Sequence, residues 1–174
     1  AVTVGVNATL GGNGIINGSV TVNAGGILSP GASLGIRTLN SDLTLAGDLF
    51  IEVDKSLSPS NDMVTVAGML TNAGIGTVTV TNLGTNVLVA GDSFQIFNKG
   101  VSNGLALIVV SAGGVVWTNK LDVDGSIAVL SAPMPKVPAT NLTILAAGPT
   151  SFNLGGMGAA NSAYGVYAST NVTT

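Results

Sequence analysis

The sequence predicts an all-β fold: a short β-solenoid that runs into an antiparallel β-rich segment and is followed by a C-terminal β tail. A short phrase returns along the chain, in Val20-Thr21-Val22, Leu43-Thr44-Leu45 and Val64-Thr65-Val66, and a glycine-containing turn follows each copy. A unit of roughly 20 residues that repeats is typical of solenoids, in which each rung buries its apolar face on the next. The chain is 46% hydrophobic and only 7% charged, so threonine, serine, asparagine and glycine must cover its surface.

Residues 1–54 are predicted to form the stacked rungs of the solenoid. Thr3, Thr21 and Thr44 each lie between two aliphatic residues, which is the alternation of a strand with one buried face. Asn-Gly, Gly-Gly and Pro-Gly pairs between these runs indicate turns. The predicted interior includes Val20, Val22, Leu28, Leu43, Leu45 and Leu49.

Residues 55–130 are predicted to be a β-rich segment that ends the stack. A polar loop at 55–62 comes first, and longer apolar runs follow it. These runs are predicted to be successive antiparallel strands: Val64–Val66, Gly76–Asn82, Ser93–Phe97, Leu105–Ser111, Val115–Trp117 and Ser126–Leu130. Asp124-Gly125 predicts a two-residue hairpin turn. The denser core of this half is expected to contain Phe94, Ile96, Phe97, Leu107 and Trp117.

The last part of the chain is predicted to be a linker and a small β tail. Prolines at residues 131–140 oppose regular sheet and favour an extended linker. Residues 141–174 hold two or three strand-like runs, which are too few to bury a core of their own. We therefore expect an incomplete β module or a tail that packs on another subunit.

The order of these segments resembles the autotransporter-associated β-strand repeat. The resemblance covers roughly residues 8–130, from Leu10-Gly11-Gly12 through the Val20–Gly35 and Leu43–Leu49 segments to Leu121–Ile127. Such repeats occur in passenger regions of bacterial autotransporters and in large secreted proteins of environmental bacteria such as Verrucomicrobia and Planctomycetes. The resemblance implies a right-handed β-solenoid with a structural role outside the cell or at its surface. It implies no catalytic residues.

Composition excludes several classes of function. The formal net charge is −3, and the five basic residues are scattered, so nothing supports nucleic-acid binding. The chain contains neither cysteine nor histidine, and it has no apolar stretch long enough to span a bilayer as a helix. We expect a secreted or cell-surface protein without a cofactor.

Candidate catalytic and metal-binding residues have structural explanations that we favour. Gly31–Gly35 matches a nucleophile elbow around Ser33, but the chain has no histidine to act as the base. Asp122–Gly125 resembles the start of a calcium loop and is better explained as a hairpin. Asp54 and Asp62 flank a polar loop and could bind a cation together with backbone carbonyls, but we interpret the segment as a solvated loop. Glu52 and Asp54 alternate on a predicted strand at a spacing that glycosidases also use, which we interpret as a solvated face.

Polar and aromatic side chains allow a second interpretation of the surface. Four Asn-x-Ser/Thr sequons are present, at Asn7, Asn17, Asn141 and Asn171, and chance explains them in so polar a chain. We expect Asn7, Asn17 and Asn23 to cap turns or to stack as amide ladders. Tyr164, Tyr167 and Trp117 are the candidates for stacking on sugars, although Trp117 is expected in the core.

These observations predict a non-enzymatic extracellular structural protein, a self-assembling subunit of a filament, sheath or stalk. The alternative is an adhesin or a module that binds a surface glycan. The strand at Val2–Val6 is expected to expose an open edge, and the tail is expected to pair with a neighbouring chain by donor-strand contacts. The predicted intersubunit contacts are Val2, Val4, Val6, Leu142, Ile144, Phe152 and Val166.

Overall fold

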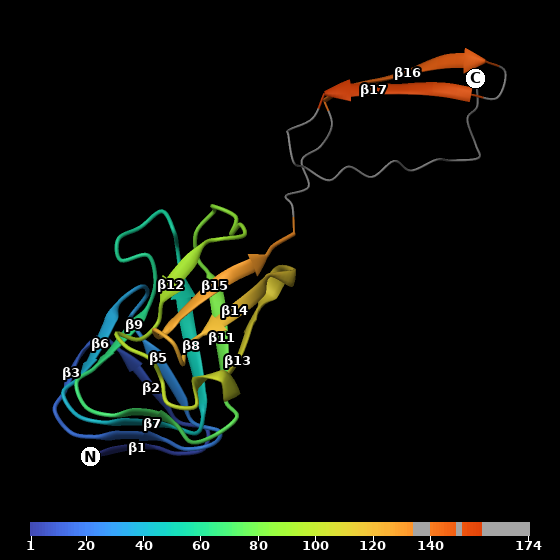
Figure 1. The fold of residues 1–174 in the computed structure, drawn as a ribbon. Helices are drawn as coiled ribbons and strands as arrows, with labels where there is room; N and C mark the ends of the chain where they lie inside the picture. Colours follow the sequence, from blue (N-terminus) through green and yellow to red (C-terminus); the bar gives the residue numbers. More distant parts are fainter. Residues whose placement is uncertain (134–139, 149–150, 158–174) are drawn as a thin grey trace. The chain divides into compact units, whose positions relative to one another are not determined.

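The computed structural model is an all-β protein and describes residues 1–133, 140–148 and 151–157 (Figure 1). The chain divides into two compact units, Ala1–Ala132 and Pro133–Thr174. Unit 1 contains a β-solenoid whose first three coils each add one strand to each of three parallel sheets; the chain after β9 extends only two of these sheets. Unit 2 contains a single described hairpin.

Sheet A contains two of the three copies of the repeated phrase, whereas the third copy, Val64–Val66, lies in sheet C. The four strands of sheet A are β1 (Val2–Val4), β4 (Val20–Val22), β7 (Leu43–Leu45) and β10 (Leu70–Asn72), and all of them pair in parallel. The register aligns the middle residues, so that Thr3, Thr21, Thr44 and Thr71 form one column. The residues on either side of each threonine point inward, as the period of two requires. They are aliphatic in β1, β4 and β7, whereas β10 has Leu70 and the buried Asn72.

Sheets B and C form the other two sides of the coil. Sheet B has the order β13-β11-β8-β5-β2, and its strands are Ile108–Ser111, Thr77–Asn82, Asp48–Val53, Ile27–Pro30 and Thr9–Gly12. Sheet C has the order β3-β6-β9, and its strands are Gly14–Ile16, Ile36–Leu39 and Met63–Val66. All pairs in both sheets are parallel.

An antiparallel sheet follows the coils, and it is smaller than the sequence predicted. Sheet D has the order β12-β15-β14, with strands Ser93–Gln95, Ser126–Ser131 and Val116–Lys120. Two short 3₁₀ turns, Gly104–Ala106 and Ala112–Gly114, flank β13.

The prediction of antiparallel strands at Val64–Val66, Gly76–Asn82 and Leu105–Ser111 was wrong. β9 pairs in parallel with β6. β11 and β13 pair in parallel with each other, and β11 pairs in parallel with β8. The coil therefore continues past residue 54 in sheet B. The alternation in this segment identifies strands but carries no information about the direction of the partner strand.

The β14–β15 hairpin is present, but its loop is longer than predicted. Lys120 pairs with Ser126, so residues 121–125 form a five-residue loop in place of the expected two-residue turn. Leu121 lies in this loop and is fully buried. Gly125 adopts a φ of 82°, the left-handed conformation that glycine allows.

The core consists of columns of aliphatic side chains that run along the stack. All six predicted interior residues of the first coils are at most 1% exposed, which confirms that prediction. Phe94, Ile96, Phe97 and Leu107 are also buried, whereas Trp117 is half-buried against the core. The Trp117 ring lies 6.2 Å from that of Phe94, and its indole N–H donates to the Ser111 hydroxyl at 2.9 Å.

Glycines allow successive coils to approach closely at the corner between sheets A and B. A glycine directly precedes three of the sheet B strands: Gly26 before β5, Gly47 before β8 and Gly76 before β11. A Cβ on Gly47 would overlap the carbonyl oxygen of Gly26, and one on Gly76 would overlap that of Gly47. This column of glycines therefore sets the backbone spacing at one corner of the solenoid.

Unit 2 contains the antiparallel hairpin of β16 (Thr140–Gly148) and β17 (Ser151–Met157). The register places Ile144 opposite Leu154 and Ala146 opposite Phe152. The predicted tail at 141–174 thus begins with two paired strands, and Val166 lies outside the described residues.

Candidate functional site

Ser33 does not occupy a nucleophile elbow. It lies in the bend between β5 and β6, and the segment that follows is a strand, whereas an elbow requires a helix there. Gly31 in the same bend has a φ of 91°. The Gly31–Gly35 motif therefore forms a corner of the solenoid.

Asp62 is the most buried carboxylate among the described residues, with 0% of its surface exposed. Its two oxygens accept hydrogen bonds from the backbone N–H groups of Gly35 and Glu52, both at 2.9 Å. Burial is the largest influence on this carboxyl and raises its pKa to about 6, although both hydrogen bonds favour the charged form. Asp62 thus joins two coils from the inside.

Asp54 and Asp62 do not converge on a common cation. Asp54 accepts from the backbone N–H and the hydroxyl of Ser56, at 2.9 and 2.6 Å, and the hydroxyl bond is the main cause that lowers its pKa. Each carboxylate therefore has its own protein donors. Among the residues that the structure describes, no group of three His, Cys, Asp or Glu side chains is placed to hold a metal ion.

Glu52 and Asp54 do not share a strand face, which corrects the prediction. β8 ends at Val53, and Asp54 begins the turn after it. The backbone N–H of Glu52 donates to Asp62, and Asp54 is only 8% exposed. The pair of carboxylates that the alternation suggested is therefore not formed.

Asp122 and Asp124 lie in the hairpin loop between β14 and β15. Asp124 accepts from the Ser126 N–H at 2.9 Å and from the Ser126 hydroxyl at 2.6 Å, and these bonds lower its pKa. This is an Asx-type turn in which the carboxylate binds the chain two residues on. The motif lies in a β-hairpin, as predicted, but in a five-residue loop and not in a two-residue turn.

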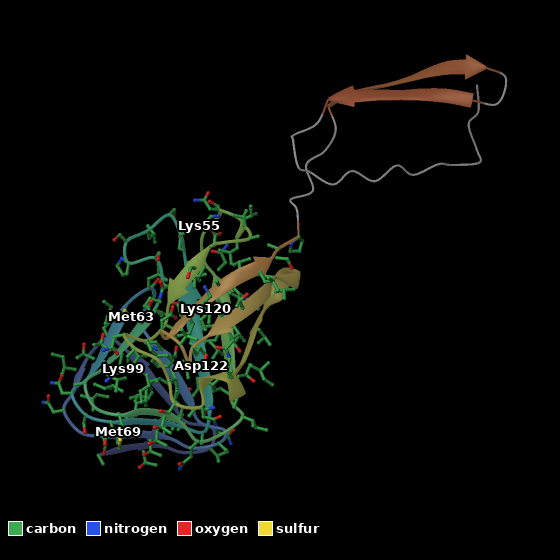
Figure 2. The ribbon with its side chains drawn as sticks, viewed as in Figure 1. Lys55, Met63, Met69, Lys99, Lys120 and Asp122 are labelled. Carbon is green, nitrogen blue, oxygen red and sulfur yellow. The ribbon has the colours of Figure 1, made fainter. Side chains whose placement is uncertain are left out.

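The charged side chains of unit 1 do not gather into a patch. Figure 2 shows Lys55, Lys99 and Lys120 as separate side chains. Lys55 forms an ion pair with Asp92 at 2.9 Å, and Lys99 donates to the carbonyl groups of Ala67 and Gly68. These two lysines therefore stabilise loops of this chain, which gives no support to a polyanion site.

Asparagine side chains also connect coils, as the sequence predicted for Asn17. The Asn40 amide donates to the Asn17 side-chain oxygen at 2.8 Å, which is one step of an amide ladder. Asn7 occupies a turn with a φ of 61°. Of the other sequons, Asn141 lies in β16 and Asn171 lies outside the described residues, as do Tyr164 and Tyr167.

The N-terminal end of the solenoid is the surface that these structural roles leave unexplained. β1, β2 and β3 are the outermost strands of sheets A, B and C, so one coil ends all three sheets. Val2 is half-buried there, whereas Val4 is only 4% exposed and belongs to the core. Val6 lies beyond the end of β1, in the corner, and is 68% exposed. Only Val2 and Val6 of the three predicted contact residues are therefore available at this end.

Unit 1 thus belongs to the class of parallel β-solenoids with one end open. Comparison of the chain with known protein families, with curated proteins and with solved structures gives no match. Within the described residues, no helix is both long and apolar enough to cross a membrane.

Proposed function

We propose that this protein is a non-enzymatic structural protein of the cell surface or the extracellular space, which assembles through β-strand contacts between chains. The observation that carries the proposal is the open coil of β1, β2 and β3, whose edges can pair with further strands. The resemblance to the autotransporter-associated β-strand repeat agrees with such a scaffold role.

The internal chemistry of the coils supports a scaffold. The carboxylates of Asp42, Asp48 and Asp62 each accept a backbone N–H from a neighbouring coil, at 2.7, 2.8 and 2.9 Å respectively. Side chains that elsewhere act in catalysis or metal binding are here engaged in stacking. The expected contribution of the tail is a donor strand from β16 or β17, with Leu142, Ile144 and Phe152 as apolar anchors.

Electron microscopy of the purified chain, together with sedimentation, tests this function. We expect extended assemblies, and we expect truncation after Ser131 to shorten them because the tail is removed. Circular dichroism controls for the folding of the truncated protein. Assemblies of equal length with and without the tail would show that the tail makes no joint, and an intact chain that stays monomeric at high concentration would contradict the proposal.

A glycan-binding surface is the second candidate, and the threonine column of sheet A favours it. Thr3, Thr21, Thr44 and Thr71 are in register at the strand spacing of about 4.8 Å. Such a regular row of hydroxyl groups is suited to hydrogen bonding along an extended polysaccharide. Co-sedimentation with insoluble polysaccharides tests it: Thr21→Val and Thr44→Val together should abolish binding, and the absence of binding by the unmodified chain would exclude this candidate.

A further inference from the structure

At the N-terminal end the apolar columns of all three sheets lose their cover. In sheet A, Val2 stacks on Val20; the corresponding pairs in sheets B and C are Leu10 on Leu28 and Ile16 on Leu39. The second residue of each pair is at most 1% exposed, whereas the first is half-buried. Each side of the first coil therefore exposes part of one aliphatic side chain beside an unpaired strand edge.

This end has short strands, of three or four residues, but it lacks other features that protect sheet edges. Residues 1–36 contain no Asp, Glu, Lys or Arg, and the first charged side chain is that of Arg37. Edge strands are usually protected by charged residues, by proline or by bulges, yet β1, β2 and β3 contain no proline and pair with the second coil without a shift in register. A neutral, apolar edge of this kind is suited to further pairing.

We propose that a second copy of this chain covers the open end, N-terminal end to N-terminal end, with β1 antiparallel to β1 of the second copy. This inference rests on the proposed assembly by strand contacts and specifies one of its joints. Seen from its N-terminal end, every copy winds in the same rotational sense. When two copies face each other through these ends, the chain of one first coil therefore runs opposite to the chain of the other along each of the three sheets. Their facing strands are antiparallel.

A second copy fits this surface better than an isolated peptide strand does. A single extended segment pairs with only one of the three edges, whereas the same coil of a second copy provides an edge for each of them. Residues 1–19 of each copy have no charged side chain of their own. The nearest is Arg37 of the second coil, which donates to the Gly11 carbonyl and is only 7% exposed, so its charge is already buried within each copy. The first coil, residues 1–19, approaches the roughly 20–30 residues that each side of a stable interface contributes.

The sequence of β1 specifies the register of the joint. If the two-fold axis passes through Thr3, then Val2 lies opposite Val4 of the second copy, and both residues share the inward phase of the strand. Thr3 then lies opposite Thr3 of the second copy, with Cα atoms about 4.5–5.5 Å apart. This register continues the aliphatic interior of one solenoid into the other.

Sedimentation velocity of the full 174-residue chain tests the joint. Thr3→Lys places two ammonium groups opposite each other and should shift dimers, or any larger species, towards monomers or smaller species by at least tenfold in dissociation constant. Thr44→Lys is the matched control, because it adds the same charge to the same column two coils further from the open end. Equal association of Thr3→Lys and the unmodified chain would overturn the joint.

Cross-linking provides a second measurement that does not depend on destabilising the chain. The protein has no cysteine, so Thr3→Cys introduces a single thiol at the two-fold axis, within disulfide distance of its copy. We expect a disulfide-linked dimer on oxidation, and none for Thr44→Cys. Equal cross-linking of the two variants, or none, overturns the inference.

The outcomes separate this inference from the proposed function. Closed dimers that cross-link through Thr3→Cys, with no larger species, would support the joint and contradict the extended assembly. Extended assemblies that are unaffected by Thr3→Lys would support the function and contradict the joint. A chain that is monomeric under all conditions would contradict both, and its open end would then be covered by something other than a second copy.

Discussion

Substitution of Gly76 by alanine tests whether close backbone approach at the corner between sheets A and B holds the coils together. The added Cβ would lie 2.7 Å from the carbonyl carbon of Gly47 and would overlap its oxygen. The obstacle is backbone, so the two coils must separate locally. Overpacking of this kind costs about 3 kcal/mol, and the lower entropy of the unfolded alanine chain offsets about 0.5 kcal/mol.

Gly5→Ala is the matched control for this substitution. No atom outside its immediate chain neighbours lies within 4 Å of the Cβ position at Gly5, and Gly5 does not have a positive φ. The same chemical change should therefore leave the free energy of unfolding within about 1 kcal/mol of the unmodified value.

The measurement is urea unfolding followed by the fluorescence of Trp117, which is the only tryptophan and is half-buried against the core. We expect Gly76→Ala to lower the free energy of unfolding by about 2–3 kcal/mol, and the melting temperature by roughly 4–12 °C. If Gly76→Ala and Gly5→Ala unfold at the same urea concentration, the coils are not in contact at this corner.

Four further substitutions examine two carboxylates, one core residue and one exposed residue. The pKa of Asp62 in the folded protein is about 6, so Asp62 binds a proton more tightly there than in the unfolded chain. Protonation of Asp62 therefore stabilises the fold fully below about pH 4, and this stabilisation is lost as the pH rises through 6. The free energy of unfolding lost over this pH range is roughly 3 kcal/mol. Urea titrations between pH 4 and 7 should show this loss of stability, and Asp62→Asn should remove it. Asp124 has a lowered pKa, so its contribution has the opposite sign: it is complete above about pH 4 and is lost as the pH falls through the pKa of the folded protein. In urea titrations extended below pH 4, Asp124→Asn should reduce the loss of stability at acid pH. Leu45→Ala, at a position that is 0% exposed, should cost about 2–5 kcal/mol in calorimetry. Met69→Ala, at a position 71% exposed, should change stability by less than about 0.5 kcal/mol.

The repeated phrase made much of the first part of the fold predictable. The aliphatic residues around Thr21 and Thr44 follow a period of two, and the same phase places both in one column of sheet A. The parallel pairing of β11 with β8 was not predictable in this way. The loop at 54–61 lengthens that coil and hides the repeat, and an alternating run is compatible with either strand direction.

The buried carboxylate was missed because ionisable residues are rarely placed inside. A signal was nevertheless present in the sequence. Asp62 precedes Val64 by two residues and Val66 by four, so it shares their inward phase, and both valines are fully buried. Arg37 has the same relation to Leu39 and is only 7% exposed. If the in-and-out alternation of each strand is continued to the residues before its apolar ones, Asp62 and Arg37 are both predicted to face inward.

The open first coil has a consequence for how the solenoid loses its structure. In a stack where each coil contacts mainly its neighbours, stability behaves as a one-dimensional chain of interfaces. The first coil has one interface, on β4, β5 and β6, whereas the coil of β4, β5 and β6 has two. In the isolated chain we therefore expect opening to begin at this terminus and to advance coil by coil, so that the amides of β1 exchange before those of β4, and those of β4 before those of β7.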